Sequence, residues 1–343
     1  MAASMSLPAI DIHTHMVPGH FPASLAGAPS AIEIRRGCDC GHAEVFVDGR
    51  QFRSITDECW DIGRRLETMD RMGIGRQILS PMPELLSFWR PADEAAAIAE
   101  HVNAELAAMV ERAPGRFAAL GMVPLQDPDR AIRMLEKLMA ERSFLGVEIG
   151  TNIGGIPLGD ARFRPFFAAA ERVGAAIFVH PLKPLACYPL PGPGAMEALA
   201  CFPCETALAA VSIIASNIAI DHPGLRIAFS HGGGALSLLL PRLDHGWRTT
   251  PAVGAAIADL PSLQARRFFY DMLVYDGETL RFLMRSLGKT QLCIGTDLPF
   301  AVAERDPLGR IAGLELLPAD EGLLRHGNAA RFLGFEEDGP QQH

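Results

Sequence analysis

Five side chains of the types that bind metal ions and transfer protons each follow a short apolar run. His13 and His15 end the segment Ile-Asp-Ile-His-Thr-His, and His180, His231 and Asp297 end later runs. Residues i and i+2 of a strand point to the same face, so His13 and His15 can bind one ion. Imidazole and carboxylate ligands suit zinc, with manganese, iron and cobalt as alternatives. The pattern therefore predicts one divalent metal, which would activate a bound water.

Each of these residues has an ordinary explanation when taken alone. A His-x-His pair on a strand is more often a packed polar pair, and His180 could be a satisfied buried histidine. Asp297, in Gly-Thr-Asp, could cap a turn or a helix. Their joint placement at the ends of four separate predicted strands favours the metal site.

The elements that would position these residues alternate along the chain as βα units, which predicts a parallel sheet. Glycines occur at several of the helix-to-strand connections, where they commonly end helices. The predicted strands cover residues 9–15, 75–80, 117–124, 145–150, 176–180, 226–231, 268–273 and 291–297. The predicted helices cover residues 61–72, 94–112, 127–141, 161–173, 205–216 and 278–286. Eight such strands predict a (β/α)8 TIM barrel, in which the carboxyl ends of the strands form the active-site face.

Two insertions interrupt this alternation, and both follow predicted strands. Residues 16–58 are rich in Gly, Pro and short β-like runs, so we expect a small β-rich subdomain or flap after strand one. Residues 182–203 contain five prolines and are expected to form a long irregular loop. We expect residues 1–334 to form one metal-dependent barrel domain and residues 335–343 to form a flexible tail.

The composition is that of a globular protein with a large core. The 343 residues are 49% hydrophobic and 21% charged, with a formal net charge of −9 and no cluster of Lys and Arg. This balance argues against nucleic acids or anionic membranes as partners. The N-terminus lacks the pattern of a secretory signal, and apolar stretches such as 209–220 are too short to span a bilayer. We therefore expect a cytoplasmic enzyme.

The seven cysteines do not suggest a disulfide framework, because their number is odd and their spacing irregular. Two close pairs occur, Cys38 with Cys40 and Cys201 with Cys204. A structural zinc site needs four ligands, and neither pair has an evident second half. We expect isolated thiols, with a structural metal site as the alternative.

Longer motifs extend over nearly the whole chain. The sequence resembles the amidohydrolase superfamily, and most closely its aminocarboxymuconate-semialdehyde decarboxylase branch. The matching segments are IDIHTH (10–15), QFR (51–53), ECWD (58–61), LETMDRMGI (66–74), ILSPMP (78–83), GVEIGT (146–151), FVHP (178–181), PCET (203–206), HGGGAL (231–236), RLDHGW (242–247), FYDMLV (269–274), GTDLPF (295–300) and GNAARFLG (327–334).

The resemblance implies a role for each residue of the predicted site. The metal ligands would be His13, His15, His180 and Asp297. His231 matches the acid/base histidine that exchanges a proton with the metal-bound water, and Asp297 is expected to serve in catalysis as well as in metal binding. A histidine in this position suits general acid/base catalysis, because its pKa lies near neutrality.

The resemblance also implies the groups that bind substrate and the oligomeric state. Arg53 matches an arginine that holds a substrate carboxylate, which its planar fork can bind at two points. Phe300 matches an aromatic residue that lines the pocket. Arg242 matches an arginine contributed to the neighbouring subunit's active site, which implies a homodimer. The alternatives are an exposed loop residue for Arg53 and a salt bridge with Asp244 for Arg242.

Three further observations bear on the site. Asp271 could accept a hydrogen bond from a ligand histidine, or pair within the core. Glu148, on the fourth strand, keeps a bridged two-metal site open, although the absence of a lysine on that strand favours one metal. The loop 182–203 lacks the tryptophans that the muconate-semialdehyde decarboxylases have there, so the family resemblance does not define the substrate.

These expectations converge on a metal-dependent, oxygen-independent decarboxylase of a small unsaturated or aromatic carboxylic acid, with no organic cofactor. The alternative enzyme is a hydrolase of a lactone, amide or diketone that uses the same metal-bound hydroxide. A metal-binding sensor or scaffold would not need the acid/base group, yet His231 is present in its Gly-rich segment.

Overall fold

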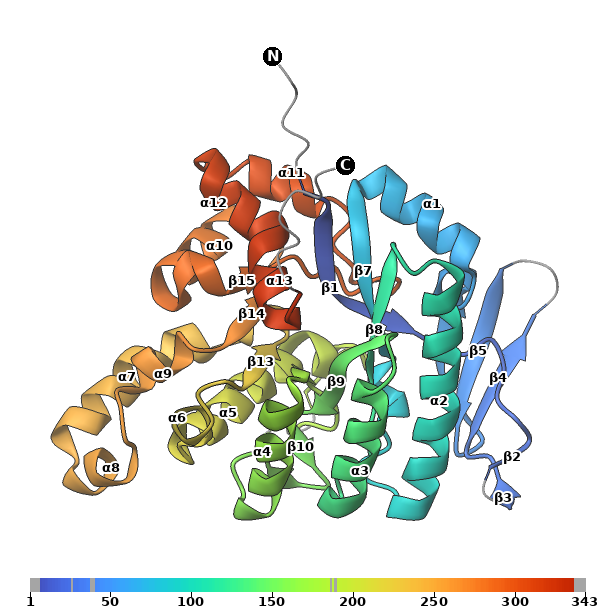
Figure 1. Cartoon of the computed structure of the whole chain (residues 1–343), viewed down its shortest axis with the longest axis horizontal. Helices are drawn as coiled ribbons and strands as arrows, with labels where there is room; N and C mark the ends of the chain where they lie inside the picture. Colours follow the sequence, from blue (N-terminus) through green and yellow to red (C-terminus); the bar gives the residue numbers. More distant parts are fainter. Residues whose placement is uncertain (1–6, 26, 38–40, 186, 188–189, 336–343) are drawn as a thin grey trace.

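Eight parallel strands form the centre of the molecule in a computed structural model that describes residues 7–25, 27–37, 41–185, 187 and 190–335 (Figure 1). The strand order is β1-β7-β8-β9-β12-β13-β14-β15, so each strand lies beside the next one of the set. The strands are β1 Ala9–Met16, β7 Ile74–Pro81, β8 Phe117–Gly121, β9 Phe144–Gly150, β12 Ala176–His180, β13 Arg226–Phe229, β14 Phe269–Asp271 and β15 Leu292–Cys293.

The sheet closes between its first and last strands. Ile12 N donates to Ile294 O at 2.9 Å, and His15 N donates to Leu298 O at 2.7 Å. The buried carboxylate of Asp11 also accepts hydrogen bonds from the side chain and backbone N–H of Thr296, at 2.6 and 3.1 Å. The predicted (β/α)8 TIM barrel is confirmed.

Helices surround the barrel, and the predicted ones begin and end close to where local signals place them. Asp61 and Asp127 cap α1 and α3 by accepting hydrogen bonds from backbone N–H groups, and Gly73 ends α1 in the left-handed conformation. The helices are α1 Ile62–Met72, α2 Ala92–Arg112, α3 Pro128–Met139, α4 Arg164–Val173, α5 Phe202–Ala215, α6 Ile218–Asp221, α7 Leu236–Thr249, α8 Pro251–Ala256, α9 Pro261–Ala265, α10 Gly277–Leu283, α11 Pro307–Ala312, α12 Pro318–Gly322 and α13 Asn328–Leu333. Helices α7 and α8 extend away from the barrel at one side of the molecule (Figure 1).

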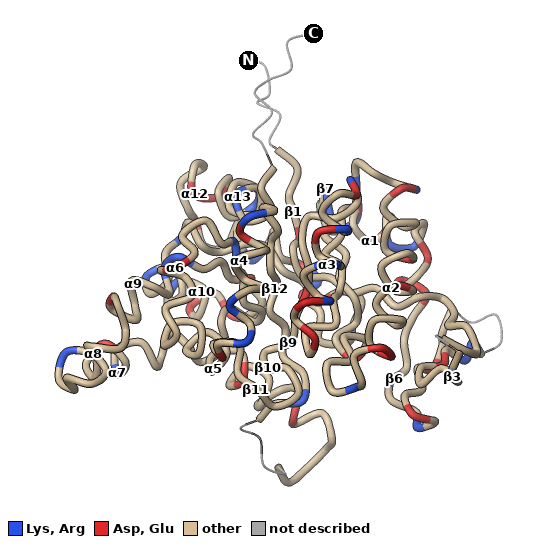
Figure 2. Tube along the Cα trace, turned by 60° about the horizontal axis from the view of Figure 1, so that its bottom comes forward, with Lys and Arg blue, Asp and Glu red and all other residues tan. Residues whose placement is uncertain are grey.

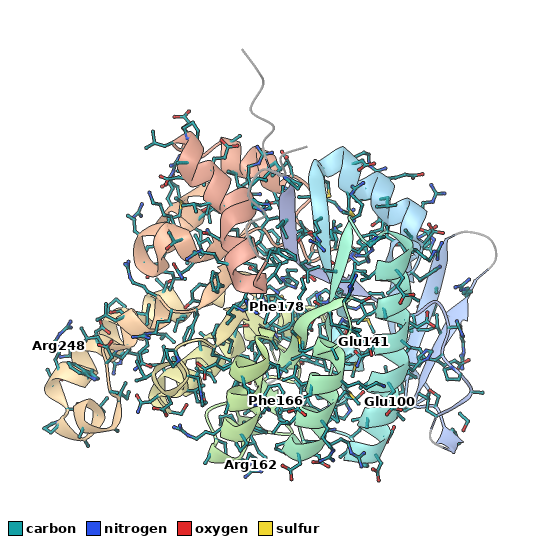
Figure 3. The ribbon with its side chains drawn as sticks, viewed as in Figure 1. Glu100, Glu141, Arg162, Phe166, Phe178 and Arg248 are labelled. Carbon is teal, nitrogen blue, oxygen red and sulfur yellow. A yellow bond between two sulfur atoms is a disulfide. The ribbon has the colours of Figure 1, made fainter. Side chains whose placement is uncertain are left out.

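Apolar side chains fill the space inside the barrel and between the barrel and its helices. Phe178 of β12 is fully buried near the middle of the molecule, and Phe166 of α4 is buried between its helix and the strands (Figure 3). The Phe178 ring packs against His13, with 4.9 Å between the ring centroids. Charged side chains lie on the outer helices, where Lys and Arg are interspersed with Asp and Glu (Figure 2).

Four strands end earlier than the sequence suggested, which corrects those boundaries. β8 ends at Gly121, β13 at Phe229, β14 at Asp271 and β15 at Cys293. His231 and Asp297 therefore lie in turns just beyond their strands, with φ values of 56° and 60°. The backbone turns there and brings both side chains over the barrel mouth. The spacing of apolar residues in the sequence does not reveal such a turn.

The expected β-rich insertion is present after the first strand. β4 Ile32–Arg36, β5 His42–Val47 and β6 Arg50–Thr56 form an antiparallel sheet, preceded by the two-residue strands β2 Ser24–Leu25 and β3 Ala28–Pro29. Ile32, Val45 and Ile55 are buried in the main hydrophobic core, so one face of this sheet packs on the barrel.

The segment after β12 is only partly the irregular loop that we expected. A π-helical turn over Glu197–Cys201 continues directly into α5, so the helix begins well before residue 205. The continuous helix Glu197–Ala215 has 19 residues and a mean hydropathy of 1.8, enough by length and composition to cross a membrane. The apolar stretch 209–220, which we judged too short from the sequence, contains only the last part of this helix. Ala207, Ala210 and Ile213 are buried in the barrel core, and core helices of this kind pass the same test.

The cysteines also differ from the expectation of isolated thiols. Cys187, in the loop after β12, forms a disulfide with Cys201 at the start of the α5 helix. The path of the loop brings the two together, and their spacing of 14 residues gave no sign of it. Cys204 is a free, exposed thiol, whereas Cys59 and Cys293 are free and buried. Cys38 and Cys40 lie outside the described residues.

Candidate active site and metal centre

The four predicted metal ligands come together at the mouth of the barrel. One donor atom from each of His13, His15, His180 and Asp297 lies within 4.8 Å of the other three. His13 Nε2 is 3.1 Å from His15 Nε2, and His15 Nε2 is 3.1 Å from Asp297 Oδ1. Strands β1 and β12 supply the histidines, and the turn after β15 supplies the aspartate.

Hydrogen bonds on the far side of each imidazole set its orientation. The Nδ1 atoms of His15 and His180 lie 3.0 Å from the carbonyl oxygens of Pro81 and Pro181, and can only donate to them. The Nδ1 atom of His13 lies 2.6 Å from Asp271 Oδ2, so of the two alternatives for Asp271 the structure shows the contact with a candidate ligand histidine. Each Nε2 atom is then left with its lone pair directed at the others.

This arrangement of donor atoms fits a cation. When both imidazoles are neutral and use Nδ1 as the donor, the Nε2 atoms of His13 and His15 face each other 3.1 Å apart with their lone pairs, and a shared cation suits both. His180 Nε2 is buried with no hydrogen-bond partner. Three imidazole nitrogens and one carboxylate match the ligand set of a divalent transition metal such as zinc or manganese.

The electrostatics of the cluster separate its charged and neutral members. Burial lowers the pKa of His180 well below its usual value, and the neighbouring His15 and His13 lower it further. Burial also opposes the charge of His13, but the hydrogen bond to Asp271 raises its pKa to about 9. For Asp297, burial is outweighed by the nearby imidazoles of His15 and His13, and the pKa falls to about 2. An ionised carboxylate therefore faces the imidazoles.

His231 lies next to this cluster, as the sequence suggested. Its ring centroid is 5.1 Å from that of His180, and its backbone N–H donates to Asp271 Oδ2 at 2.9 Å. Burial, followed by the charge of His13, lowers the pKa of His231 to about 4. Asp271 thus holds His13 and the turn that carries His231 at the same time.

The glycines after His231 make this turn possible. Gly234 has a φ of 57°, and a Cβ atom there would lie 1.8 Å from the carbonyl oxygen of Pro203. Only glycine fits such a close approach of the backbone to α5, which in turn lines the site.

A cavity of about 330 Å³ opens at the cluster. Its wall is mostly apolar. It is lined by Arg53, Pro83, Glu84, His180, Ala198, Leu199, Phe202, Pro203, His231, Gly234, Leu273, Val274, Tyr275, Asp297, Phe300 and Val302. Two predicted substrate-binding residues, Arg53 and Phe300, are therefore in the cavity.

Arg53 and Phe300 connect the insertion to the metal cluster through direct contacts. The Arg53 guanidinium, from β6, lies 4.2 Å from the Phe300 ring centroid. The Phe300 ring stacks on His15, with 5.1 Å between centroids and 22° between planes. Arg53 also donates a hydrogen bond to Glu84 Oε1 at 3.1 Å. The insertion thus completes the site, because it places a cation beside the cluster.

Arg242 does not reach the cavity of its own chain. It lies exposed on α7, and the structure has no ion pair between it and Asp244, both of which are described. Asp244 instead accepts hydrogen bonds from the backbone and side chain of Ser262. The role of Arg242 in a neighbouring subunit stays a prediction.

Glu148 lies close to the cluster without joining its converging donor atoms. Its Oε2 is 3.9 Å from His15 Nδ1, a nitrogen whose hydrogen bond goes to Pro81. Burial raises the pKa of Glu148 well above its usual value, and neither of its oxygens has a hydrogen-bond partner. The two-metal alternative stays a prediction.

Two polar residues of the cavity were missed in the sequence, Glu84 and Tyr275. Glu84 stands in the turn η2, Pro83–Leu85, directly after β7, so a search for carboxylates near strand ends could have found it. Tyr275 lines the cavity with a φ of 57°, and no sequence signal distinguishes it from a surface residue.

Comparisons with known proteins agree with this geometry. A family model described as amidohydrolase matches residues 10–335. The chain is 32% identical to 2-amino-3-carboxymuconate-6-semialdehyde decarboxylase of Dictyostelium discoideum over 331 residues, 95% of this chain and 92% of that protein. It is 30% identical to gamma-resorcylate decarboxylase of Rhodococcus jostii (strain RHA1) over 271 residues, 74% and 82% of the two chains.

A solved structure is similar over almost the full length. The dihydroxybenzoic acid decarboxylase of Polaromonas sp. JS666, with bound manganese and the inhibitor 2-nitroresorcinol, matches with a TM-score of 0.72 and 22% identity, covering 95% of this chain and 97% of that one. The fold and the site define a metal-dependent barrel enzyme. The chain belongs to the amidohydrolase family, in its decarboxylase branch. These relatives support carbon–carbon lyase activity over the hydrolase alternative.

Proposed function

We propose that this enzyme removes carbon dioxide from a small aromatic or unsaturated carboxylic acid without using oxygen. The observation that supports this most directly is the placement of Arg53 and His231 in one cavity with the four-residue metal cluster. A cation for the carboxylate and a proton-transferring group then face the same small space. The decarboxylases named above act on acids of this kind.

One divalent metal would be held by His13, His15, His180 and Asp297, and we propose zinc, with manganese as the alternative. When bound, the metal supplies a Lewis acid that polarises a substrate oxygen. Asp271 orients His13 for this purpose through its hydrogen bond.

Arg53 binds and orients the substrate. Its guanidinium presents N–H donors in a planar fork that matches a carboxylate, and the Phe300 ring holds one face of it. The apolar wall, with residues such as Leu199 and Leu273, excludes water from the reacting carbon. Exclusion of water also favours conversion of the charged carboxylate into neutral carbon dioxide.

His231 transfers the proton. Because its lowered pKa leaves the ring neutral near pH 7, the ring first takes up a proton from solvent and then delivers it to the carbon that bears the carboxylate. The bond from that carbon to the carboxylate breaks, and its electrons restore the conjugated system. One proton is gained and one carbon dioxide is lost. General acid/base catalysis of this kind contributes about 10²–10⁴-fold to the rate.

We further propose that the enzyme works as a cytoplasmic homodimer in which Arg242 completes the partner's site. The exposure of Arg242 on α7, away from the cavity of its own chain, supports this arrangement.

The proposal is tested with metal-stripped enzyme reconstituted with Zn²⁺ or Mn²⁺ and supplied under nitrogen with a panel of hydroxylated and aminated aromatic carboxylates. We expect carbon dioxide release that requires the metal and no oxygen. A hydrolysed product without carbon dioxide, from lactone, amide or diketone substrates, would contradict it.

A further inference from the structure

Three cysteines lie together where α5 begins, and the proposed reaction uses none of them. Cys201 and Cys204 are the ends of the sequence Cys-Phe-Pro-Cys, and Cys187 is bonded to Cys201. Among the free cysteines of the described residues, Cys204 is exposed, whereas Cys59 and Cys293 are buried, which raises the pKa of both thiols. A disulfide exchanges with a thiolate that can reach it. Cys204 is therefore the free cysteine suited to exchange with this disulfide.

The helix places Cys204 within bonding range of Cys201. Cys201 has helical backbone angles, φ −78° and ψ −32°, and α5 begins at the next residue. Side chains three positions apart on a helix lie on the same face, with their Cα atoms about 5 Å apart. The Cα atoms of Cys187 and Cys201 are 5.7 Å apart, and both distances lie within the range that disulfides span. Cys201 can therefore bond to either of the other two cysteines.

The loop that carries Cys187 is held against α5 by contacts that do not involve the disulfide. Glu205 Oε2 accepts a hydrogen bond from the backbone N–H of Leu185 at 3.0 Å. Asn152 Nδ2 donates to Glu205 Oε1 and to the carbonyl oxygen of Lys183, both at 3.1 Å, and the side chains of Glu205 and Asn152 are buried. Two residues span at most about 7 Å, so Cys187 stays near this anchor when the disulfide is reduced. The disulfide can therefore open and form again.

The segment between the two cysteines of α5 belongs to the proposed active site. Phe202 and Pro203 line the cavity. The carbonyl oxygen of Pro203 accepts a hydrogen bond from the backbone N–H of Ala235 at 3.2 Å, directly after the turn that carries His231. A change in the bonding of Cys201 therefore reaches the cavity wall and the backbone beside His231.

We propose that Cys204 accepts oxidation from a low-molecular-weight disulfide and relays it to Cys201 and Cys187, so that the cavity wall responds to the redox state. The inference rests on the proposed function in one respect, that the reaction takes place in this cavity. A small thiol in excess would drive the same exchanges in reverse and open the disulfide.

The relay consists of three exchanges. The Cys204 thiolate attacks the external disulfide, forms a mixed disulfide and releases one small thiolate. The Cys201 thiolate then attacks Cys204 Sγ and releases the second small thiolate. Finally, the Cys187 thiolate attacks Cys201 Sγ, and the electron pair of the broken bond leaves on Cys204. Two cysteine thiols are oxidised, the external disulfide is reduced to two thiols that take up the two protons, and Cys204 is regenerated.

Reoxidation of the reduced protein tests the relay. The metal-loaded full chain is reduced in its folded state, transferred into glutathione disulfide and quenched with acid at intervals, and its disulfides are mapped by peptide mass spectrometry. We expect a Cys201–Cys204 pair to appear first and to convert into the Cys187–Cys201 pair. In Cys204→Ser the first pair is lost and the second forms several-fold more slowly, because the oxidant must attack a less exposed thiol.

The matched control is Cys59→Ala, which removes a buried free thiol and should reoxidise like the unmodified protein. If Cys204→Ser does not fold, alkylation of Cys204 in the folded, oxidised protein gives the same comparison. A disulfide with a purely structural role forms at the same rate with and without Cys204. Equal rates, with no Cys201–Cys204 pair at any time, would overturn the relay.

Amide hydrogen exchange tests the effect on the cavity wall. We expect the Ala235 amide to exchange about two- to tenfold faster in the reduced protein, as when one backbone hydrogen bond weakens. The Met122 amide, which donates to Asn103 Oδ1 at 2.8 Å, should not change. Equal exchange of Ala235 in both states would contradict the response of the wall. Neither measurement requires carbon dioxide release, so a failure of the relay and a failure of decarboxylation are distinguishable.

Discussion

Among single residues, the direction in which each imidazole donates decides what the site can bind. His13, His15 and His180 each use Nδ1 for a neighbouring oxygen, so their Nε2 atoms are left for a shared ligand. The Nδ1 of His231 also lies near an oxygen, 3.3 Å from the hydroxyl of Ser230, but His231 differs because it does not join the converging donor atoms. This difference separates the proposed metal ligands from the proposed acid/base group.

Replacement of His231 by alanine tests whether this residue transfers protons and does not bind the metal. We expect His231→Ala to lower kcat by about 10²–10⁴-fold, the usual contribution of a general acid or base. The metal content, measured by elemental analysis, should not change, because the four donor atoms remain. His101→Ala, outside the cavity, serves as the control. Activity near that of the unmodified enzyme would refute the role of His231.

A substitution of Asp271 provides a second test on a single residue. Its Oδ2 lies 2.6 Å from His13 Nδ1 and accepts from the backbone of His231, and its Oδ1 accepts from the backbone of Gly232. We expect Asp271→Asn to weaken metal binding by about 10–100-fold, because the oriented ligand histidine loses its ionised partner. Competition with a chelator of known affinity measures this. Metal affinity equal to that of the unmodified protein would show that Asp271 only supports the turn.

Among the secondary structure elements, the segment after β12 departs most from its sequence-based prediction. Its prolines indicated a loop, and the first part is irregular, but Ala198 and Phe202 lie on a helix that lines the cavity. The disulfide between Cys187 and Cys201 ties the loop to the start of this helix. The loop is therefore linked covalently to the helix that lines the cavity.

Thiol labelling tests this arrangement. Without reductant, iodoacetamide should modify Cys204, which is exposed, and spare Cys59, whose burial raises its pKa to about 12, so that almost no thiolate forms near neutral pH. After reduction of the native protein, Cys187 and Cys201 should also react. Peptide mass mapping identifies the modified sites. Labelling of Cys187 before reduction would refute the disulfide.

At the scale of the whole molecule, the barrel brings together residues that are almost 300 positions apart. The contacts of Asp11 with Thr296 join the first strand to the turn after the last one, and His13 and Asp297 lie on that strand and in that turn. Arg242 is exposed on α7, so its predicted role depends on whether a second chain binds there and receives it in its own site.

Mixing of two inactive variants answers it. If Arg242 acts in the partner's site, a hybrid dimer of His231→Ala and Arg242→Ala chains contains one intact site. Random reassociation of equal amounts should then restore about a quarter of the original activity, since about half of the dimers are hybrids with one working site of two. Each variant alone remains inactive. No recovery after verified chain exchange would contradict the shared site.

The sequence by itself determined the fold class, the four side chains whose donor atoms converge and the place of His231 beside them. The apolar runs of β1 and β12 are local signals, and a parallel barrel brings every strand end to one face, so residues at those ends must meet. The β-rich insertion was predictable for the same reason, from its short runs between turn residues.

Only the tertiary structure decided the rest, because those features depend on contacts between segments distant in the sequence. The ion pair of Glu84 with Arg53 joins the turn after β7 to the insertion, and the Cys187–Cys201 disulfide depends on the path of the loop after β12. The turns at His231 and Asp297 have positive φ values that periodicity does not encode. Local sequence patterns therefore identified the candidate metal-binding and proton-transferring residues. Contacts between distant segments determined the shape of the cavity beside them.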